Sequence, residues 1–169
     1  MIIVRIIGGL GNQMFQYAAG YALSKKNKTS LLLDTNAFKN KKIHNGFELN
    51  SVFNIEAEIA TDKKIKDLIG WRNLEFIKDR INRLPKFLIG KNFFSERLNL
   101  NYSLIKDNTY LYGYWQSEKF FLDYKNHILQ QFQFKKSLSL KNKNLDQLIN
   151  ETQNSVSIHI RRGDYLKSK

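Results

Sequence analysis

The sequence predicts an α/β fold in which a parallel sheet is flanked by helices. Three observations support this prediction. An apolar, β-branched run opens the chain, a stretch with helical spacing follows it, and a second apolar run comes directly after that stretch. Strand, helix and strand in this order are typical of a βαβ unit, whose strands are parallel and whose crossover is right-handed.

The first βαβ unit is expected over residues 2–34. Residues 2–7 form a nearly continuous apolar run, which suits a strand covered on both faces. Glycines at positions 8, 9 and 11 break this strand and predict a tight turn. Asn12 is expected to cap the following helix, which ends in the basic residues Lys25, Lys26 and Lys28. The second strand is expected at residues 30–34.

The later elements are less regular. Residues 36–108 combine basic, Asn-rich loops with short amphipathic pieces, and Pro85 separates two expected helices. The aromatic run 110–115 predicts another strand, after which Ser117 is expected to cap a helix that extends to about residue 132. A shorter helix is expected at 144–151. Strict alternation over 155–161 predicts a final strand.

Length and composition exclude several classes of protein. The chain has 169 residues, and its apolar content of 42% is too high for a disordered polyelectrolyte. It has no cysteine, which excludes a disulfide framework, a thiolate zinc site and a catalytic thiol. No apolar run reaches the roughly 20 residues that cross a bilayer. We therefore expect a cytoplasmic protein, with peripheral attachment to the inner face of the membrane as an alternative.

The formal net charge of +13 predicts a partner that carries phosphate. Nucleic acid, acidic lipid and a nucleotide substrate all fit this charge. One alternative is therefore a small basic module that binds RNA or an anionic surface, and another is a remnant without a ligand. A nucleic-acid binder would lose affinity steeply as the salt concentration rises.

The glycine-rich turn after the first strand is the first candidate site. Proteins with α/β folds place anionic ligands between the carboxyl end of a strand and the positive N-terminus of a helix. Gly9 and Gly11 are therefore expected to let a phosphate or a sugar hydroxyl approach the backbone. The third glycine of the dinucleotide fingerprint is missing, which disfavours NAD. A sharp structural turn without a ligand is an equally good explanation of the glycines.

The second candidate site follows the alternating strand near the end of the chain. Arg161 and Arg162 stand together there, and two guanidinium groups can meet a diphosphate with paired donors. Asp164 is placed to orient one arginine or to cap the next turn. The alternative is a solvated pair of arginines before an ordinary Gly-Asp turn.

Three motifs occur in a fixed order: GGLGNQMFQYA at 8–18, GYWQSEK at 113–119 and HIRRGDY at 159–165. Together they resemble the α-1,2-fucosyltransferases of glycosyltransferase family 11. The resemblance implies the N-terminal Rossmann-like domain of a GT-B glycosyltransferase at 1–152, on the acceptor side. Residues 153–169 would begin a C-terminal donor-binding domain, of which only the first strand and turn are present. Activity of this chain alone is therefore not expected.

The resemblance also implies the reaction. Fucose would pass from GDP-fucose to a galactose hydroxyl of an oligosaccharide, with inversion and without a metal or another cofactor, and no nucleic acid would be bound. Arg161 is the expected catalytic residue, because a fixed positive donor stabilises the charge that develops on the β-phosphate. The general base is not identified, and Asp34 and Glu118 are expected to be structural. The expected donor-binding residues are Arg161, Arg162, His159, Asn12, Gly9 and Gly11, supported by Asp164 and Gln13.

Overall fold

The computed structural model describes residues 1–39, 45–55, 57–78, 80–84, 86–98, 102–158 and 160. Contacts between Cα atoms divide the chain into two compact units, Met1–Lys135 and Lys136–Lys169. This division falls inside the first domain expected from the sequence. The expected domain boundary at residue 152 stays a prediction.

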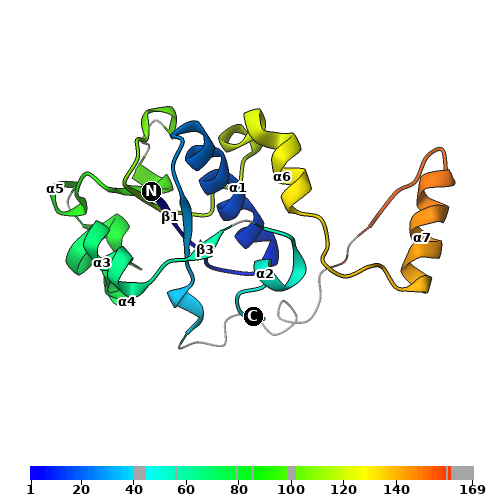
Figure 1. Cartoon of the computed structure of the whole chain (residues 1–169), viewed down its shortest axis with the longest axis horizontal. Coiled ribbons are helices and arrows are strands. Elements are labelled where there is room, and N and C mark those ends of the chain that lie inside the picture. Colours follow the sequence, from blue (N-terminus) through cyan, green and yellow to red (C-terminus); the bar gives the residue numbers. More distant parts are fainter. Residues whose placement is uncertain are drawn as a thin grey trace. The chain divides into compact units, whose positions relative to one another are not determined.

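The first unit is built on a parallel sheet, in which the described strands follow the order β3-β2-β1-β5-β4 (Figure 1). The central strand β1 (Ile2–Arg5) pairs with β2 (Leu31–Asp34) on one side and with β5 (Thr109–Tyr112) on the other. The outer strands are β3 (Glu58–Ile59) and β4 (Phe93–Ser95). The predicted α/β fold with a Rossmann-like parallel sheet is confirmed.

Helices cover both faces of this sheet (Figure 1). Side chains alternate along β1, so that Ile2 and Val4 join one apolar core and Ile3 joins the other. The first core is covered by α1 (Leu10–Lys26), α2 (Leu49–Val52) and α6 (Lys125–Gln131). The second core is covered by α3 (Asp62–Ile69), α4 (Glu75–Lys78) and α5 (Lys86–Ile89).

Short 3₁₀ turns connect these elements. They are η1 (Asn36–Phe38), η2 (Gly70–Asn73), η3 (Ile81–Arg83), η4 (Glu96–Leu98), η5 (Tyr102–Leu104), η6 (Glu118–Phe120) and η7 (Leu122–Tyr124). The single helix expected after Ser117 is wrong, because the chain forms η6 and η7 before α6 begins at Lys125. Ser117 precedes η6, but its side chain makes no capping hydrogen bond.

The helix α1 packs closely against the sheet at Gly20. A Cβ atom at this position would lie 2.2 Å from Cγ2 of Val4 and 3.0 Å from Cδ1 of Leu31. Both distances are shorter than a normal contact between carbon atoms. The absence of a side chain at Gly20 therefore allows α1 to approach β1 and β2.

The prediction that Asn12 caps α1 is wrong. The helix begins at Leu10, and Gly9 occupies the N-cap position in an extended conformation with φ −75° and ψ 173°. Asn12 is consequently the third residue of the helix, and its side chain is free of the capping role. The strand β1 also ends at Arg5, two residues before its expected end.

The second unit contains α7 (Leu140–Glu151), whose N-cap Ser139 accepts a hydrogen bond from the backbone N–H of Asn142 at 3.3 Å. This confirms the expected helix at 144–151, which starts four residues earlier than predicted. The final strand is wrong for residues 155–158 and 160, which are irregular and highly exposed. No described strand pairs with them, and an isolated strand lacks a hydrogen-bond ladder. None of the described helices is long and apolar enough to cross a bilayer.

Candidate functional site

Two of the three motifs meet at the carboxyl edge of the sheet. The glycine motif follows β1, and the motif at 113–119 follows the neighbouring strand β5. The side-chain amide of Gln116 donates a hydrogen bond of 2.6 Å to Oδ1 of Asn12. Residues that are 104 positions apart thus contact each other where strands that are not consecutive in the chain lie side by side. Ligands of α/β proteins commonly bind at such places.

Gly8 is the glycine that this geometry requires. Its φ of +79° lies in the left-handed region, and a Cβ atom there would be 2.6 Å from Nδ2 of Asn12. Gly9 has a negative φ, and a Cβ atom on Gly11 would meet no atom within 4 Å. The conformational demand therefore falls on Gly8, whereas Gly9 and Gly11 stay predicted donor contacts.

Gln13 joins three backbone segments around the glycine turn. Its Nε2 donates hydrogen bonds of 2.9 Å to the carbonyl oxygens of Gly8 and Gly46. Its Oε1 accepts a hydrogen bond of 2.9 Å from the backbone N–H of Glu48. The side chain is fully buried, so these three bonds are shielded from water. Gln13 thus positions the turn, which gives a physical basis for its expected supporting role.

The N-terminus of α1 offers donors to an anion. The first N–H groups of a helix have no acceptor within the helix, and they carry the positive end of its dipole. No side chain caps α1, and its first turn contains no acidic residue. Gln16, which is buried one turn later, accepts a hydrogen bond of 2.9 Å from the N–H of Ile7 and steadies the end of β1.

The turn after β5 is held by Glu96. Oε2 of Glu96 accepts hydrogen bonds from the backbone N–H groups of Tyr114 at 2.7 Å and Trp115 at 3.0 Å. Trp115 has a φ of +55°, and a Cβ atom on Gly113 would lie 2.5 Å from Cβ of Glu96. The carboxylate of Glu96 therefore stabilises the turn that brings Gln116 to Asn12. Sequence reasoning missed Glu96, since nothing near residue 96 marks it as a partner of residues 114 and 115.

The aromatic residues of β5 and of this turn are mostly buried. Tyr110 and Trp115 have 0% and 3% of their surface exposed, whereas Tyr114 has 41% exposed. An aromatic run in a strand can either stack on sugar rings or be buried in the sheet. Burial is the explanation that the structure supports for Tyr110 and Trp115.

A buried charged cluster lies at the same edge on the opposite face of the sheet. Nζ of Lys78 is 2.6 Å from Oδ2 of Asp34 and 2.8 Å from Oε1 of Glu75. Nη2 of Arg5 is 2.8 Å from Oε2 of Glu75. The hydroxyl of Tyr110 donates a hydrogen bond of 2.5 Å to Asp34. Two cations and two carboxylates therefore compensate each other, with Arg5, Asp34 and Lys78 buried and Glu75 40% exposed at the edge of the cluster.

This cluster assigns Asp34 a structural role, as expected. Its carboxylate binds Lys78 and Tyr110, and also accepts a hydrogen bond of 3.0 Å from the backbone N–H of Asn36. Burial, together with the Asp34 charge, raises the pKa of Tyr110 well above its usual value, so the phenol stays protonated and donates. The charged Arg5 inside the apolar run 2–7 was a signal in the sequence. Glu75 and Lys78 gave none.

The predicted residues of the third motif, His159, Arg161, Arg162 and Asp164, lie outside the described residues. Among the described residues, the side chain of Glu118 is exposed and makes no hydrogen bond or ion pair. The part of the chain that the structure describes holds no group of three His, Cys, Asp or Glu side chains arranged to bind a metal.

Comparison with known proteins identifies the family. The model of Glycosyl transferase family 11 matches residues 1–169. The chain belongs to this family. This confirms the family on which the expected reaction rests, whereas the donor and the acceptor stay predictions.

Two curated relatives from Escherichia coli are similar to this family 11 chain. An alpha-1,2-colitosyltransferase is 40% identical over 171 residues, which cover 99% of this chain and 56% of the relative. The O-antigen biosynthesis glycosyltransferase WbnK is 36% identical over 181 residues, which cover 94% of this chain and 58% of the relative. The chain thus spans little more than half the length of these relatives. No solved structure matches it.

Proposed function

We propose that this chain forms the acceptor-side part of an inverting glycosyltransferase that transfers fucose from GDP-fucose to a galactose hydroxyl of an oligosaccharide. Membership of family 11 supports the reaction class. The name of one relative includes alpha-1,2 transfer, and that of the other includes O-antigen biosynthesis. Both names fit the formation of a glycosidic bond on a larger glycan.

The observation that carries this proposal is the hydrogen bond between Asn12 and Gln116. It joins the glycine motif to the motif after β5 at the edge of the sheet where α/β proteins bind ligands. Oδ1 of Asn12 accepts from Gln116, so its Nδ2 remains the donor, and this atom lies over Gly8. We propose that this amide donates to an oxygen of the donor substrate, next to the positive end of α1.

The chemistry requires stabilisation of a leaving group. The acceptor oxygen forms a bond to the anomeric carbon while the bond from that carbon to the β-phosphate oxygen breaks, and the hydroxyl proton passes to a base. Negative charge grows on the diphosphate as GDP departs. We propose that Arg161 stabilises this charge, with Arg162 and His159 assisting, and that the reaction therefore needs no metal. Chelation of divalent metals is then expected to leave turnover unchanged.

Donor preference tests the proposed substrate. In a protein extended to the length of the relatives, we would measure transfer to a β-galactoside from GDP-fucose and from GDP-colitose. Colitose is fucose without its 3-hydroxyl group, and a site built to bind a hydroxyl can reject an analogue that lacks it by about 10⁴-fold. We expect GDP-fucose to be preferred. Faster transfer from GDP-colitose would show that fucose is the wrong donor, and transfer from neither would contradict the function.

Arg161→Ala tests the catalytic assignment in the same extended protein. Removal of a donor that stabilises developing charge lowers kcat by about 100-fold or more. Lys141→Ala, which changes an exposed cation in α7, is the matched control and is expected to leave turnover unchanged. Full turnover in Arg161→Ala would remove this residue from the proposed role.

The salt dependence of binding tests the alternative basic module. Titrations of the chain with GDP and with single-stranded RNA at several salt concentrations distinguish the two functions. A glycosyltransferase is expected to select GDP over other nucleotides. Tight RNA binding that falls steeply with salt, without any preference for GDP, would favour the basic module.

A further inference from the structure

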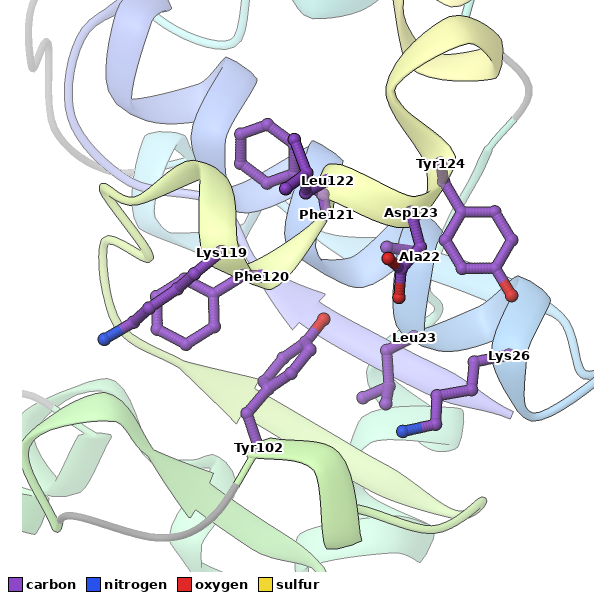
Figure 2. A pocket seen from close by; sticks show the side chains of 10 residues that line it. All are labelled: Ala22, Leu23, Lys26, Tyr102, Lys119, Phe120, Phe121, Leu122, Asp123 and Tyr124. Atoms are coloured by element: carbon purple, nitrogen blue, oxygen red, sulfur yellow. The ribbon is translucent and has the colours of Figure 1, made fainter.

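A pocket lies at the C-terminal end of α1, in the first unit (Figure 2). Its volume is about 120 Å³. The end of α1 provides one wall, η5 provides another, and η6 and η7 complete the enclosure. Its lining includes the side chains of Lys26, Tyr102, Lys119, Phe120, Asp123 and Tyr124.

This pocket is separate from the glycine turn. Lys26 in the pocket wall lies fourteen residues after Asn12 in the same helix. At about 1.5 Å per residue, the two positions are about 21 Å apart along the helix axis. The near wall is closer to the turn, because the ring of Phe121 packs 6.0 Å from that of Phe15, three residues after Asn12.

The aromatic walls of the pocket are fixed in place. The hydroxyl of Tyr102 donates a hydrogen bond of 2.5 Å to the carbonyl oxygen of Ala19, and burial raises the pKa of this phenol. The rings of Tyr102 and Phe120 meet edge to face, with centroids 5.0 Å apart. Trp115 packs against both rings from behind, at 5.6 Å from Tyr102 and 5.1 Å from Phe120. Such preformed walls lower the entropic cost of binding a ligand.

One polar group of the pocket, the carboxylate of Asp123, has no hydrogen-bond or ion-pair partner among the described residues. Figure 2 shows the carboxylate of Asp123 and the hydroxyl of Tyr102 pointing toward the middle of the pocket. Within the described residues, the side chain of Asp123 makes no hydrogen bond or ion pair. The two cations of the lining are Lys26 and Lys119, and Nζ of Lys119 lies 5.0 Å from the ring centre of Phe120. Asp123 is thus an acceptor that the fold itself does not use.

We propose that this pocket binds one neutral pyranose unit of a glycan. A pyranose presents C–H groups, which suit the negative face of an aromatic ring, and neighbouring hydroxyls, which can donate to both oxygens of a carboxylate. Two cations, Lys26 and Lys119, and one carboxylate, Asp123, line the pocket, so the choice of a neutral sugar rests on the free acceptor Asp123 and not on the net charge of the lining. The volume is below the several hundred Å³ of pockets for larger ligands, which fits a single ring.

The pocket would therefore hold the glycan at a point remote from the site of transfer. A glycan that bears the reacting hydroxyl is long enough to extend across the surface of the protein. Anchoring one of its rings at Asp123 would raise the effective concentration of the acceptor hydroxyl near the transfer site, without any contact between the anchored ring and the donor. Binding in the pocket is predicted whether or not the proposed transfer reaction is correct.

Trp115 provides a built-in reporter for the test. The chain has two tryptophans, and Trp71→Phe leaves only Trp115, which contacts two walls of the pocket. We would titrate this variant with methyl β-galactoside and with fucose, and follow both Trp115 fluorescence and saturation transfer to the sugar protons. We expect saturable binding with a dissociation constant on the order of millimolar. Glucuronate and GDP serve as anionic probes.

Asp123→Asn, in the Trp71→Phe background, decides the proposal. Loss of a charged acceptor is expected to weaken binding about tenfold or more. The matched control is Glu118→Gln, which changes an exposed carboxylate in η6 outside the pocket and is expected to bind as before. Equal binding by Asp123→Asn would overturn the proposal. So would the absence of both signals with neutral sugars, or tighter binding of glucuronate or GDP at this site. Circular dichroism confirms that each variant is folded.

Discussion

The glycine turn allows a sharp comparison between Gly8 and Gly11. In Gly8→Ala, the new side chain must adopt a φ near +79°, which costs about 1–2 kcal/mol for a residue with a Cβ atom. The Cβ atom would also lie 2.6 Å from Nδ2 of Asn12, so the Asn12 amide must move. Loss of its hydrogen bond to Gln116 adds about 1 kcal/mol. We expect a total destabilisation of about 2–3 kcal/mol.

Gly11→Ala is the matched control for this prediction. A Cβ atom at position 11 meets no neighbour, and Gly11 already lies within α1. Alanine is the better helix former, so this variant is expected to be neutral or more stable by up to about 1 kcal/mol. Comparing the two variants shows whether glycine is required at position 8 in particular, or whether any substitution in the turn lowers stability.

Urea denaturation followed by circular dichroism measures both variants. For a chain of this size, 1 kcal/mol shifts Tm by about 2–4 °C, so a loss of about 2–3 kcal/mol should lower the Tm of Gly8→Ala in a thermal melt by about 4–12 °C. The reasoning is refuted if Gly8→Ala unfolds at the same urea concentration as the unsubstituted chain. Equal losses in Gly8→Ala and Gly11→Ala would show that the positive φ is not the cause.

Three further substitutions test the packing and charges around the sheet. Lys78→Ala leaves the Asp34 carboxylate buried without its cation, and is expected to lower the free energy of unfolding by about 3–5 kcal/mol in urea titrations; a loss below 1 kcal/mol would contradict the pairing. Gly20→Ala is expected to cost about 1–3 kcal/mol, and Val4→Ala in the same chain should recover part of that loss, since the clash is with Cγ2 of Val4. Glu96→Ala removes the acceptor for two backbone N–H groups and should broaden or shift the amide NMR signals of the turn after β5; unchanged signals would exclude this role.

The first βαβ unit could be predicted because its signals are local. An apolar run before a glycine-rich turn, and a second run before Asp34, are visible in the sequence without knowledge of distant contacts. Both runs form strands that pair in parallel with Arg5 opposite Asp34. The ends of the elements were less predictable. The extended backbone of Gly9 starts α1 before Asn12, although Asn12 is the residue with the better capping side chain.

The charged and turn-holding contacts could not be predicted because they are tertiary. Lys78 pairs with a carboxylate 44 residues away, and Glu96 binds backbone groups 18 and 19 residues away. Lysine is usually exposed, so the complete burial of Lys78 contradicts its general tendency. Only the fold brings its partners near, because the amphipathic pattern and the Thr61 cap of α3 predict that helix alone and not its neighbours in space.

The carboxyl end of β1 is held from both faces of the sheet, and this has a consequence for the candidate site. On one face, Arg5 pairs with Glu75, which in turn contacts Lys78. On the other face, Gln13 and Gln16 bind the backbone at Gly8 and Ile7, just beyond this strand end.

A backbone fixed in this way presents the glycine turn in one position before any ligand arrives. Binding sites need such fixed positions, because a shift of about 1 Å in a reacting group can reduce a rate by about 100-fold. The buried charged cluster and the contacts of the glycine turn therefore fix the same stretch of backbone at the end of β1, although they lie on opposite faces of the sheet. If this is correct, substitutions at Lys78 should weaken ligand binding at the turn even under conditions in which the variant is folded. Substitutions of exposed lysines in α7 should leave that binding unchanged.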